Sequence, residues 1–252
     1  MTKPAESSAE SSAKSSASSR SWDRDTLPEG PEKLLAVREM FDAIAPRYDM
    51  VNRVMTFRLD VRWRRQTVNA LALPAGSTVI DLASGTGDLC VDLRTAGYLP
   101  ISIDLSYGML AADRSGEPRM QADILRLPIP DAAIDGVTCG FALRNLLELP
   151  AFFADIARVT RPGGRIALID VGVPKSRVLR FGNSIYFGKV VPRIGALLSD
   201  AAAYRYLPRS VAYLPEPVEM VAMLKAAGFA DAEHRYLSGG LTQQLIGTRD
   251  ES

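Results

Sequence analysis

A short glycine-rich turn with an acid at each end is the first feature that could do chemistry. It follows the apolar run Thr78–Leu82 and occupies Asp81–Asp88, which reads DLASGTGD. Gly85 and Gly87 would let a ligand approach the backbone N–H groups of a strand-to-helix turn, although glycine can also serve the conformation of the turn alone. We therefore interpret this segment as a ligand-binding turn.

The residues around the turn favour a positively charged ligand over a pyrophosphate. A dinucleotide-binding turn would need a third glycine at position 90, where this chain has Cys90. Asp81 and Asp88 could attract the ammonium and sulfonium groups of S-adenosylmethionine, a cofactor without phosphate. Asp88 could instead only cap the helix that follows.

Two further acids stand at the ends of the next expected strands. Asp104 closes the second strand, where a carboxylate can accept both ribose hydroxyls of an adenosine group. Asp123 closes the third strand and could accept the exocyclic amine of adenine. The same strand ends that hold the turn would thus bind the nucleoside.

Composition excludes several other functions. The chain has 30 Lys+Arg against 29 Asp+Glu, so its net charge gives no reason to expect nucleic acid as a partner. A single histidine, His234, rules out a His-rich metal site, and we expect no metal. Cys90 and Cys139 are isolated among apolar residues, which predicts buried free thiols in a reducing compartment.

Strands and helices must alternate to position these residues. Helices are predicted over 149–159 and 217–227, the second ended by Gly228, and two or three more over 31–71. This alternation predicts an α/β fold of Rossmann-like type, with a mostly parallel seven-stranded sheet and helices on both faces. The predicted strands are 78–82, 101–104, about 119–121, 134–140, 165–171, about 232–237 and 243–248.

The chain is predicted to have one folded unit and a tail. Residues 1–28 are rich in Ser and Ala and are expected to be disordered, which leaves a single domain over 29–252. Residues 177–214 break the alternation and are interpreted as an inserted substrate cap. The chain has no apolar run of the roughly 20 residues that a membrane span needs, so we expect it in the cytoplasm, with any membrane contact peripheral at the inner face of the cell membrane.

At this point the motifs resemble a known superfamily. Asp81–Asp88 resembles motif I of class I S-adenosylmethionine-dependent methyltransferases, and Ile103-Asp104 resembles their next acidic element. Leu127–Asp131 resembles the loop before their fourth strand, and Arg161–Arg165 the turn before the fifth. The resemblance implies the class I methyltransferase fold, with S-adenosyl-L-methionine as the cofactor.

A closer resemblance, over residues 40 to 230, is to the ubiquinone/menaquinone C-methyltransferase family. It implies methyl transfer to a ring carbon of a prenylated quinol, either demethylmenaquinol or its benzoquinol counterpart. Among the departures from the family, Asp170 stands where glutamate is common. The motifs that carry the resemblance are Phe41-Asp42, Tyr48-Asp49, Asn52, Trp63-Arg64, Phe141–Asn145, Pro192–Gly195 and Tyr204–Leu207.

The family's cofactor contacts fall on matching positions of this chain. They are Thr86 in the glycine turn, Asp104, the pair Asp123-Ile124, and Gly140, where the family commonly has serine. One side-chain contact is expected to be lost at Gly140. The resemblance is compatible with peripheral membrane contact and with a homodimer.

Catalysis requires a quinol hydroxyl to lose its proton while the ring carbon attacks the methyl group. Arg144 could hold the developing oxyanion, Asn145 could orient the ring oxygen, and Asp49 could act as the base. Alternatively, Arg144 pairs with a surface acid and Asn145 caps the following helix. Tyr48, Tyr204 and Tyr206 are predicted to line the substrate pocket.

An apolar stretch in the cap could accommodate a prenyl tail or simply pack in the core. It contains Phe181, Ile185, Tyr186, Phe187, Val190 and Val191, with Arg180, Lys189 and Arg193 nearby, a mixture that suits an anionic membrane surface. Two other functions stay open. One is methyl transfer to a soluble phenolic or polyketide product, and the other is a non-catalytic module that only binds S-adenosylmethionine.

Overall fold

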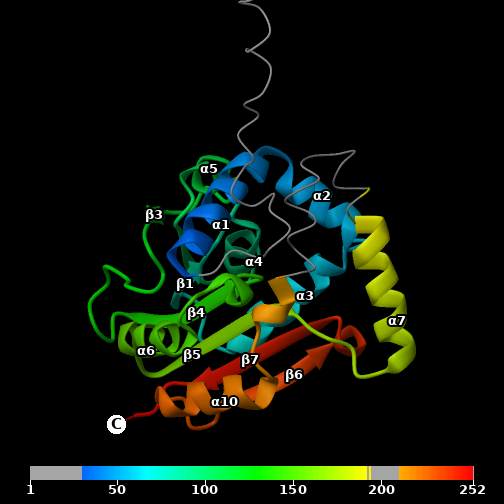
Figure 1. Ribbon diagram of the computed structural model, residues 1–252. Coiled ribbons are helices and arrows are strands. Elements are labelled where there is room, and N and C mark those ends of the chain that lie inside the picture. Colours follow the sequence, from blue (N-terminus) through cyan, green and yellow to red (C-terminus); the bar gives the residue numbers. More distant parts are fainter. Residues whose placement is uncertain (1–29, 192, 194–209, 252) are drawn as a thin grey trace, which may run out of the picture.

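The computed structural model describes residues 30–191, 193 and 210–251 (Figure 1). The predicted tail over residues 1–28 lies outside these ranges, as do Tyr204 and Tyr206. The side chains of Phe187 and Lys189 are likewise outside the described part.

The centre of the fold is a seven-stranded sheet with strand order β3-β2-β1-β4-β5-β7-β6. Neighbouring strands run parallel except that β7 is antiparallel to both β5 and β6. The predicted α/β class is confirmed. The strands are β1 (Thr78–Leu82), β2 (Leu99–Asp104), β3 (Arg119–Gln121), β4 (Ile134–Gly140), β5 (Thr160–Val171), β6 (Glu233–Leu237) and β7 (Thr242–Thr248).

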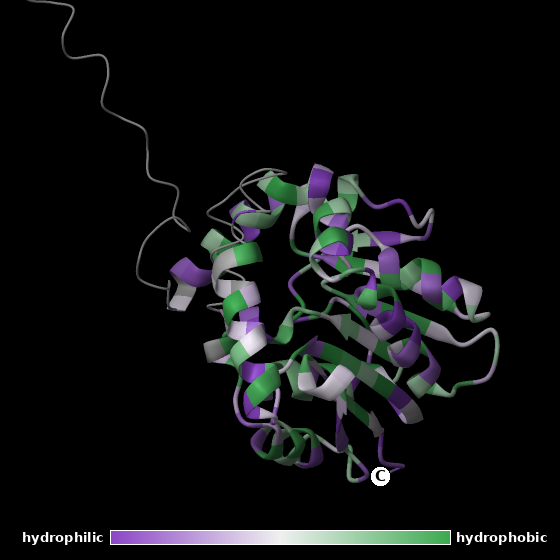
Figure 2. Cartoon of the chain, turned by 90° about the vertical axis from the view of Figure 1, so that its right-hand side faces the viewer, coloured by the Kyte–Doolittle hydropathy of each residue, from purple (hydrophilic) through white to green (hydrophobic). Residues whose placement is uncertain are grey.

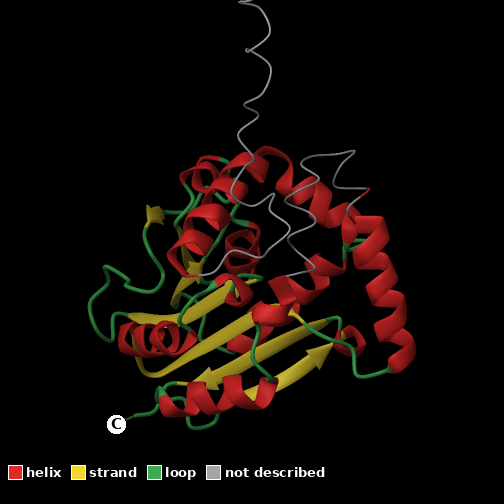
Figure 3. Ribbon diagram, in the orientation of Figure 1, coloured by secondary structure: helices red, strands yellow, loops and turns green. Residues whose placement is uncertain are grey.

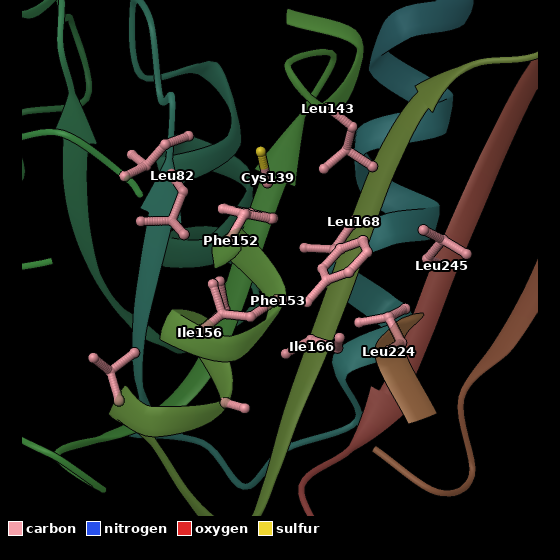
Figure 4. Close-up of a cluster of buried hydrophobic side chains, with 14 of the residues drawn as sticks. Leu82, Cys139, Leu143, Phe152, Phe153, Ile156, Ile166, Leu168, Leu224 and Leu245 are labelled. Carbon is pink, nitrogen blue, oxygen red and sulfur yellow. The ribbon is translucent and has the colours of Figure 1, made fainter. Parts of the chain in front are cut away.

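Helices cover both faces of the sheet because the central strands are apolar on both sides (Figure 3). In β5, Leu168 packs in one cluster with Phe152 of α6 (Leu149–Val159) and Leu224 of α10 (Pro217–Ala226) (Figure 4). The adjacent Ala167 packs in another cluster with α3 (Leu59–Leu71) and α4 (Asp88–Thr95). The two faces are therefore buried by different helix pairs.

Local sequence signals fix where several helices begin. Ser106 caps α5 (Tyr107–Ala111) by accepting a hydrogen bond from the backbone N–H of Met109 at 3.0 Å. Glu216 and Glu219 form a capping box at the start of α10, with Pro217 in its first turn. The helix predicted over 149–159 matches α6.

The strand predicted at Arg165 begins earlier. Thr160 already pairs with Ile134, and the register then shifts so that Arg165 pairs with Gly136. The residues between form a bulge in which Gly163 has φ +74°. Thus β5 includes the Pro-Gly-Gly segment, whereas the sequence predicted that the strand begins after it.

The N-terminal helices form a second, smaller apolar cluster with α5 and Val191. Three α-helices precede β1, as predicted: α1 (Gly30–Ile44), α2 (Tyr48–Met55) and α3, with the short η1 (Ala45–Arg47) between the first two. Within the described ranges no helix is both long and apolar enough to cross a membrane. The remaining elements are η2 (Leu143–Asn145), α7 (Arg177–Ile185), η3 (Tyr186–Val190), η4 (Val211–Tyr213) and η5 (Ser238–Gly240).

Candidate active site

A cavity of about 970 Å³ lies at the carboxyl ends of β1, β2 and β4. The strand order reverses beside β1, since β2 lies on one side of it and β4 on the other, and ligands of open α/β sheets bind at such a point. The volume is at the upper end of the range for a single small-molecule site, which leaves room for two ligands. The predicted site residues that line it are Tyr48, Asp49, Asp81, Gly85, Thr86, Asp104, Asp123, Ile124, Gly140, Arg144 and Asn145.

The glycine turn connects β1 to α4 in a conformation that needs glycine. Gly85 and Gly87 have φ of +57° and +84°. A Cβ on Gly87 would stand 2.7 Å from the carboxyl carbon of Asp113, which is too close. A Cβ on Gly85 would stand 3.9 Å from its nearest neighbour, Met109 Sδ, and would not clash. Gly87 does not line the cavity, so its part in the turn is conformational, while Gly85 lies on the cavity wall.

Asp104 is tied to the turn by backbone hydrogen bonds. One carboxylate oxygen accepts from the N–H of Gly85 and the other from the N–H of Ser106, both at 2.8 Å. Burial raises the pKa of Asp104, and these two hydrogen bonds oppose the shift by stabilising the carboxylate. The carboxylate is therefore held in place at the cavity wall before any ligand arrives.

Asp81 lies beneath the turn in a fully buried polar network. Thr138 Oγ1 donates to Asp81 Oδ1 at 2.7 Å, and Cys90 Sγ lies 3.8 Å from Asp81 Oδ2 and 3.1 Å from Ser102 Oγ. Burial raises the pKa of Asp81 to about 7, although the hydrogen bond from Thr138 favours the ionised form. Cys90 and Cys139 are free and buried, as the sequence predicted.

The cavity lining fits a cationic adenosine cofactor. Ser84 Oγ in the glycine turn is buried without a hydrogen-bond partner among the described residues. Its hydroxyl is therefore available to form a hydrogen bond with a ligand. Each lining arginine is already near an acid, as the pairs Arg38–Asp42, Arg64–Asp60 and Arg144–Asp170 show. The lining acids are Asp49, Asp60, Asp81, Asp88, Asp104 and Asp123, and the lining bases are Arg38, Arg64 and Arg144.

The expected adenine side is formed by the loop after β3 and the end of β4. Asp123 is half-buried and accepts a hydrogen bond from the Leu125 N–H at 2.9 Å, while Ile124 is buried beside it. A Cβ on Gly140 would lie 2.8 Å from Leu89 Cδ1. Leu89 thus occupies the space that a serine side chain at position 140 would need.

Asp88 lines the cavity and pairs with two arginines, and it does not cap the helix that follows. It accepts from Arg53 at 2.9 Å and lies 3.1 Å from Arg64 Nη2. The N-cap position of α4 is Gly87, so Asp88 does not cap the helix by its side chain. Its charge is shared with two arginines of the N-terminal helices, which it fastens to α4.

Two further carboxylates attach the N-terminal helices to the cofactor side. Asp49 in α2 accepts a hydrogen bond from Thr86 Oγ1 in the glycine turn. Asp42 in α1 accepts from Ser106 Oγ and from the Gly108 N–H, the latter at 2.9 Å. The sequence singled out Asp42 only as part of a family motif, and its role as an anchor depends on the packing of α1 against α5.

Arg144 is buried and paired, but not with a surface acid. Arg144 is only 4% exposed, and its guanidinium forms an ion pair with one carboxylate oxygen of Asp170. The other oxygen of Asp170 accepts a hydrogen bond from the Arg144 backbone N–H at 3.1 Å. Arg144 Nε donates to Ser210 Oγ at 3.1 Å, and Nη1 donates to the Phe141 carbonyl at 2.6 Å. The proposed surface pairing is wrong, because both partners lie inside the protein.

The loop around Arg144 is held from the other side by a buried lysine. Lys33 Nζ donates to the carbonyl of Arg144 at 3.1 Å and lies 3.6 Å from the ring centroid of Tyr213. Burial lowers the pKa of Lys33 to about 8. Asn145 is buried in the cavity wall and does not cap α6, whose N-cap position is Glu148.

Apolar and aromatic side chains also line the cavity. Tyr48 packs edge-on against Phe41 with ring centroids 5.9 Å apart, and burial raises the pKa of its hydroxyl. Trp63 faces Phe141 at 6.4 Å and donates to Ser238 Oγ at 2.8 Å. Acids at the strand ends and aromatic side chains thus line one cavity.

Comparison with known proteins agrees with this geometry. The model of the ubiE/COQ5 methyltransferase family matches residues 30–249. A demethylmenaquinone methyltransferase of Deinococcus radiodurans is 36% identical over 90% of this chain and 98% of its own length. A protein of the same name from Thermus thermophilus is 39% identical, over 83% of this chain and all of its own length.

Solved structures share the fold at low sequence identity. A Thermotoga maritima S-adenosylmethionine-dependent methyltransferase, described as a possible histamine N-methyltransferase, has a TM-score of 0.60 at 16% identity, over 85% of this chain and 99% of that one. A phosphoethanolamine N-methyltransferase of Haemonchus contortus, solved with S-adenosylhomocysteine, has a TM-score of 0.57 at 12% identity. The match covers 76% of this chain and 53% of that one. The chain belongs to the ubiE/COQ5 methyltransferase family, as its sequence motifs predicted, and is an S-adenosylmethionine-dependent methyltransferase.

Proposed function

We propose that this enzyme methylates a ring carbon of a prenylated quinol, with demethylmenaquinol as the acceptor and menaquinol as the product. The observation that carries the proposal is a single cavity lined both by acids at the strand ends and by the aromatic side chains of Phe41, Trp63 and Phe141. The relatives named demethylmenaquinone methyltransferase cover nearly the whole chain and support the same acceptor.

We assign the cofactor to the part of the cavity at the strand ends. Asp104 would accept the ribose hydroxyls, Asp123 and Ile124 would hold the adenine, and Gly85, Thr86 and Gly140 would bound the cofactor's remaining length. When bound, S-adenosylmethionine supplies an electrophilic methyl group on sulfonium. The chain has to align the acceptor with that group and exclude water.

The acceptor would lie between the N-terminal helices and the loop after β4. Tyr48 and the described part of 177–214 line this side, which supports the proposed substrate cap. Asn145 would orient the ring oxygen. Arg144 also faces the cavity, but its charge is compensated by Asp170, so its main effect would be to hold Asn145 in position.

Asp49 would take the proton of the quinol hydroxyl. Its Oδ1 accepts from Thr86, so the proton would go to Oδ2, which lies 4.0 Å from Arg114 Nη1. Asp49→Asn should lower kcat about 100-fold or more and leave cofactor affinity nearly unchanged, because asparagine still accepts from Thr86. Thr86→Val is the control, since it removes the same hydrogen bond and keeps the carboxylate. Wild-type kcat in Asp49→Asn together with a loss of kcat in Thr86→Val would assign Asp49 an anchoring role only.

Cofactor affinity should depend on pH through Asp81. Its pKa of about 7 lies above the ordinary 3.8, so the free protein holds Asp81 protonated between these values. A cationic ligand favours the carboxylate, so affinity for S-adenosylmethionine should fall about tenfold for each pH unit below 7. Titration calorimetry at pH values from about 5 to about 8, which bracket the pKa of Asp81, measures the dissociation constant of S-adenosylmethionine. In Asp81→Asn the slope should disappear, and an unchanged slope in that variant would assign it to another group.

A labelling assay tests the proposed reaction directly. The purified protein is incubated with methyl-labelled S-adenosylmethionine and chemically reduced demethylmenaquinone, with a soluble phenol in a parallel sample. Label in the lipid extract supports the proposal. Label only in the phenol would indicate a soluble aromatic acceptor, and no label despite cofactor binding would reject both acceptors.

A further inference from the structure

The cavity rim carries apolar side chains that the described part of the chain does not cover. In α7, Val178 is 81% exposed and Phe181 is 70% exposed, and Phe57 in the turn between α2 and α3 is 75% exposed. Tyr186 joins the two segments. Its ring centroid lies 5.8 Å from that of Phe57, and its hydroxyl donates to the Met55 carbonyl at 2.6 Å.

Three of the exposed apolar residues of α7 lie in a stripe along one side of the helix. Val178, Phe181 and Ile185 are spaced three and four residues apart, so they share a face. Val178 also lines the cavity, whereas Phe181 and Ile185 do not, so the stripe extends from the cavity mouth to the outside. Figure 2 views the molecule from the side on which α7 lies in Figure 1.

The backbone between α2 and α3 holds Phe57 at this rim at a conformational cost. Phe57 and Arg58 both have left-handed φ values, +51° and +62°, which residues other than glycine rarely adopt. Such conformations persist where the surrounding structure imposes them, commonly at binding sites. Here the result is a large aromatic side chain that lines the cavity and is also exposed to solvent.

The surroundings of the stripe are basic. No Asp or Glu occurs between Asp170 and Asp200. In the same stretch Lys175, Arg177 and Arg180 are exposed. An amphipathic helix with exposed apolar residues and basic neighbours matches a surface of anionic lipid, which attracts Lys and Arg while it accepts the apolar side chains.

We infer that Phe57, Val178, Phe181 and Ile185 form a docking surface for an anionic lipid bilayer and that the cavity opens towards that bilayer. The inference rests on the proposed function in one respect, because a prenylated acceptor would reach the cavity from the membrane. Two residues of the apolar stretch noted in the sequence do not belong to this surface. Val191 is buried in the core cluster of the N-terminal helices, and Tyr186 is half-buried.

Vesicle sedimentation of the full chain tests the docking surface. The wild type should bind vesicles made of equal parts phosphatidylglycerol and phosphatidylcholine. Phe181→Ser should lower the partition coefficient about tenfold, because it removes a buried aromatic contact with the lipid. Arg177→Glu should weaken binding to these vesicles by a similar factor and leave binding to pure phosphatidylcholine unchanged.

The matched control is Val218→Ser. Val218 is 74% exposed on α10, which lies below the sheet in Figure 1, away from α7. This variant should bind vesicles like the wild type. The inference is overturned if the wild type does not bind anionic vesicles, if Phe181→Ser binds as well as the wild type, or if Val218→Ser loses as much binding as Phe181→Ser.

Activity separates this inference from the proposed function. Phe181→Ser should keep wild-type turnover of a quinol with a short, water-soluble tail and lose turnover of the long-tailed quinol in vesicles. Vesicle binding without any methyl transfer would sink the proposed function and leave the docking surface standing. Methyl transfer to the quinol by a wild type that does not bind vesicles would do the reverse.

Discussion

Asp104→Ala should abolish measurable binding of S-adenosylmethionine, with a loss of affinity of about 100-fold or more. Hydrogen bonds to a charged group contribute roughly 1.5–3 kcal/mol each, and Asp104 is placed to accept two from the ribose. The substitution also removes the acceptor of the Gly85 N–H, so of its links to β2 the glycine turn keeps the backbone hydrogen bond from Ser84 to Ile103. Titration calorimetry with S-adenosylmethionine measures the effect.

The control for this prediction is Asp131→Ala. The Asp131 side chain is 77% exposed, pairs with Arg158 and does not line the cavity. This variant should bind the cofactor like the wild type. Unchanged affinity in Asp104→Ala, in a protein that unfolds at the wild-type temperature, would contradict the assignment of the cofactor to this part of the cavity.

Arg144→Ala should lower the free energy of unfolding by about 3–5 kcal/mol, because it leaves the Asp170 charge buried without its partner. The two side chains are 5% and 0% exposed, so the ion pair is shielded from solvent. A loss of this size is a large part of the stability of an average domain. Urea unfolding of the purified variant measures it.

An exposed pair serves as the comparison. Arg235 and Glu233 form an ion pair with side chains that are 52% and 50% exposed, and Arg235→Ala should cost less than about 1 kcal/mol. The double variant Arg144→Ala with Asp170→Ala should be less destabilised than the sum of the two single ones, since no charge is left unpaired. If Arg144→Ala keeps wild-type stability and loses only turnover, Arg144 acts on the acceptor, as the sequence first suggested.

The strands and most helices could be predicted because their signals are local. The apolar run before the glycine turn identified β1, and the paired glycines identified the binding edge of the sheet. Where two signals overlapped, the prediction was less accurate. The Pro-Gly-Gly turn concealed the start of β5, because Thr160 pairs with β4 before the chain bulges.

The pairings within the site could not be predicted because they join residues far apart in the chain. Thr86 and Asp49 are 37 residues apart, and Arg144 and Asp170 are 26 apart, so their contact depends on how helices pack over the sheet. One signal was available. Asp170 departs from the glutamate common in the family, and a shorter acid in the fifth strand indicates a partner close to the backbone, where Arg144 lies.

The most direct test of the proposed reaction is the position of the transferred methyl group. The purified protein is mixed with S-adenosylmethionine carrying a carbon-13 methyl group and with reduced demethylmenaquinone, and the product is examined by NMR. We predict that the labelled methyl is bonded to a ring carbon of the quinol. A methyl bonded to the quinol oxygen, or no transfer by a protein that demonstrably binds the cofactor, would contradict the proposed function.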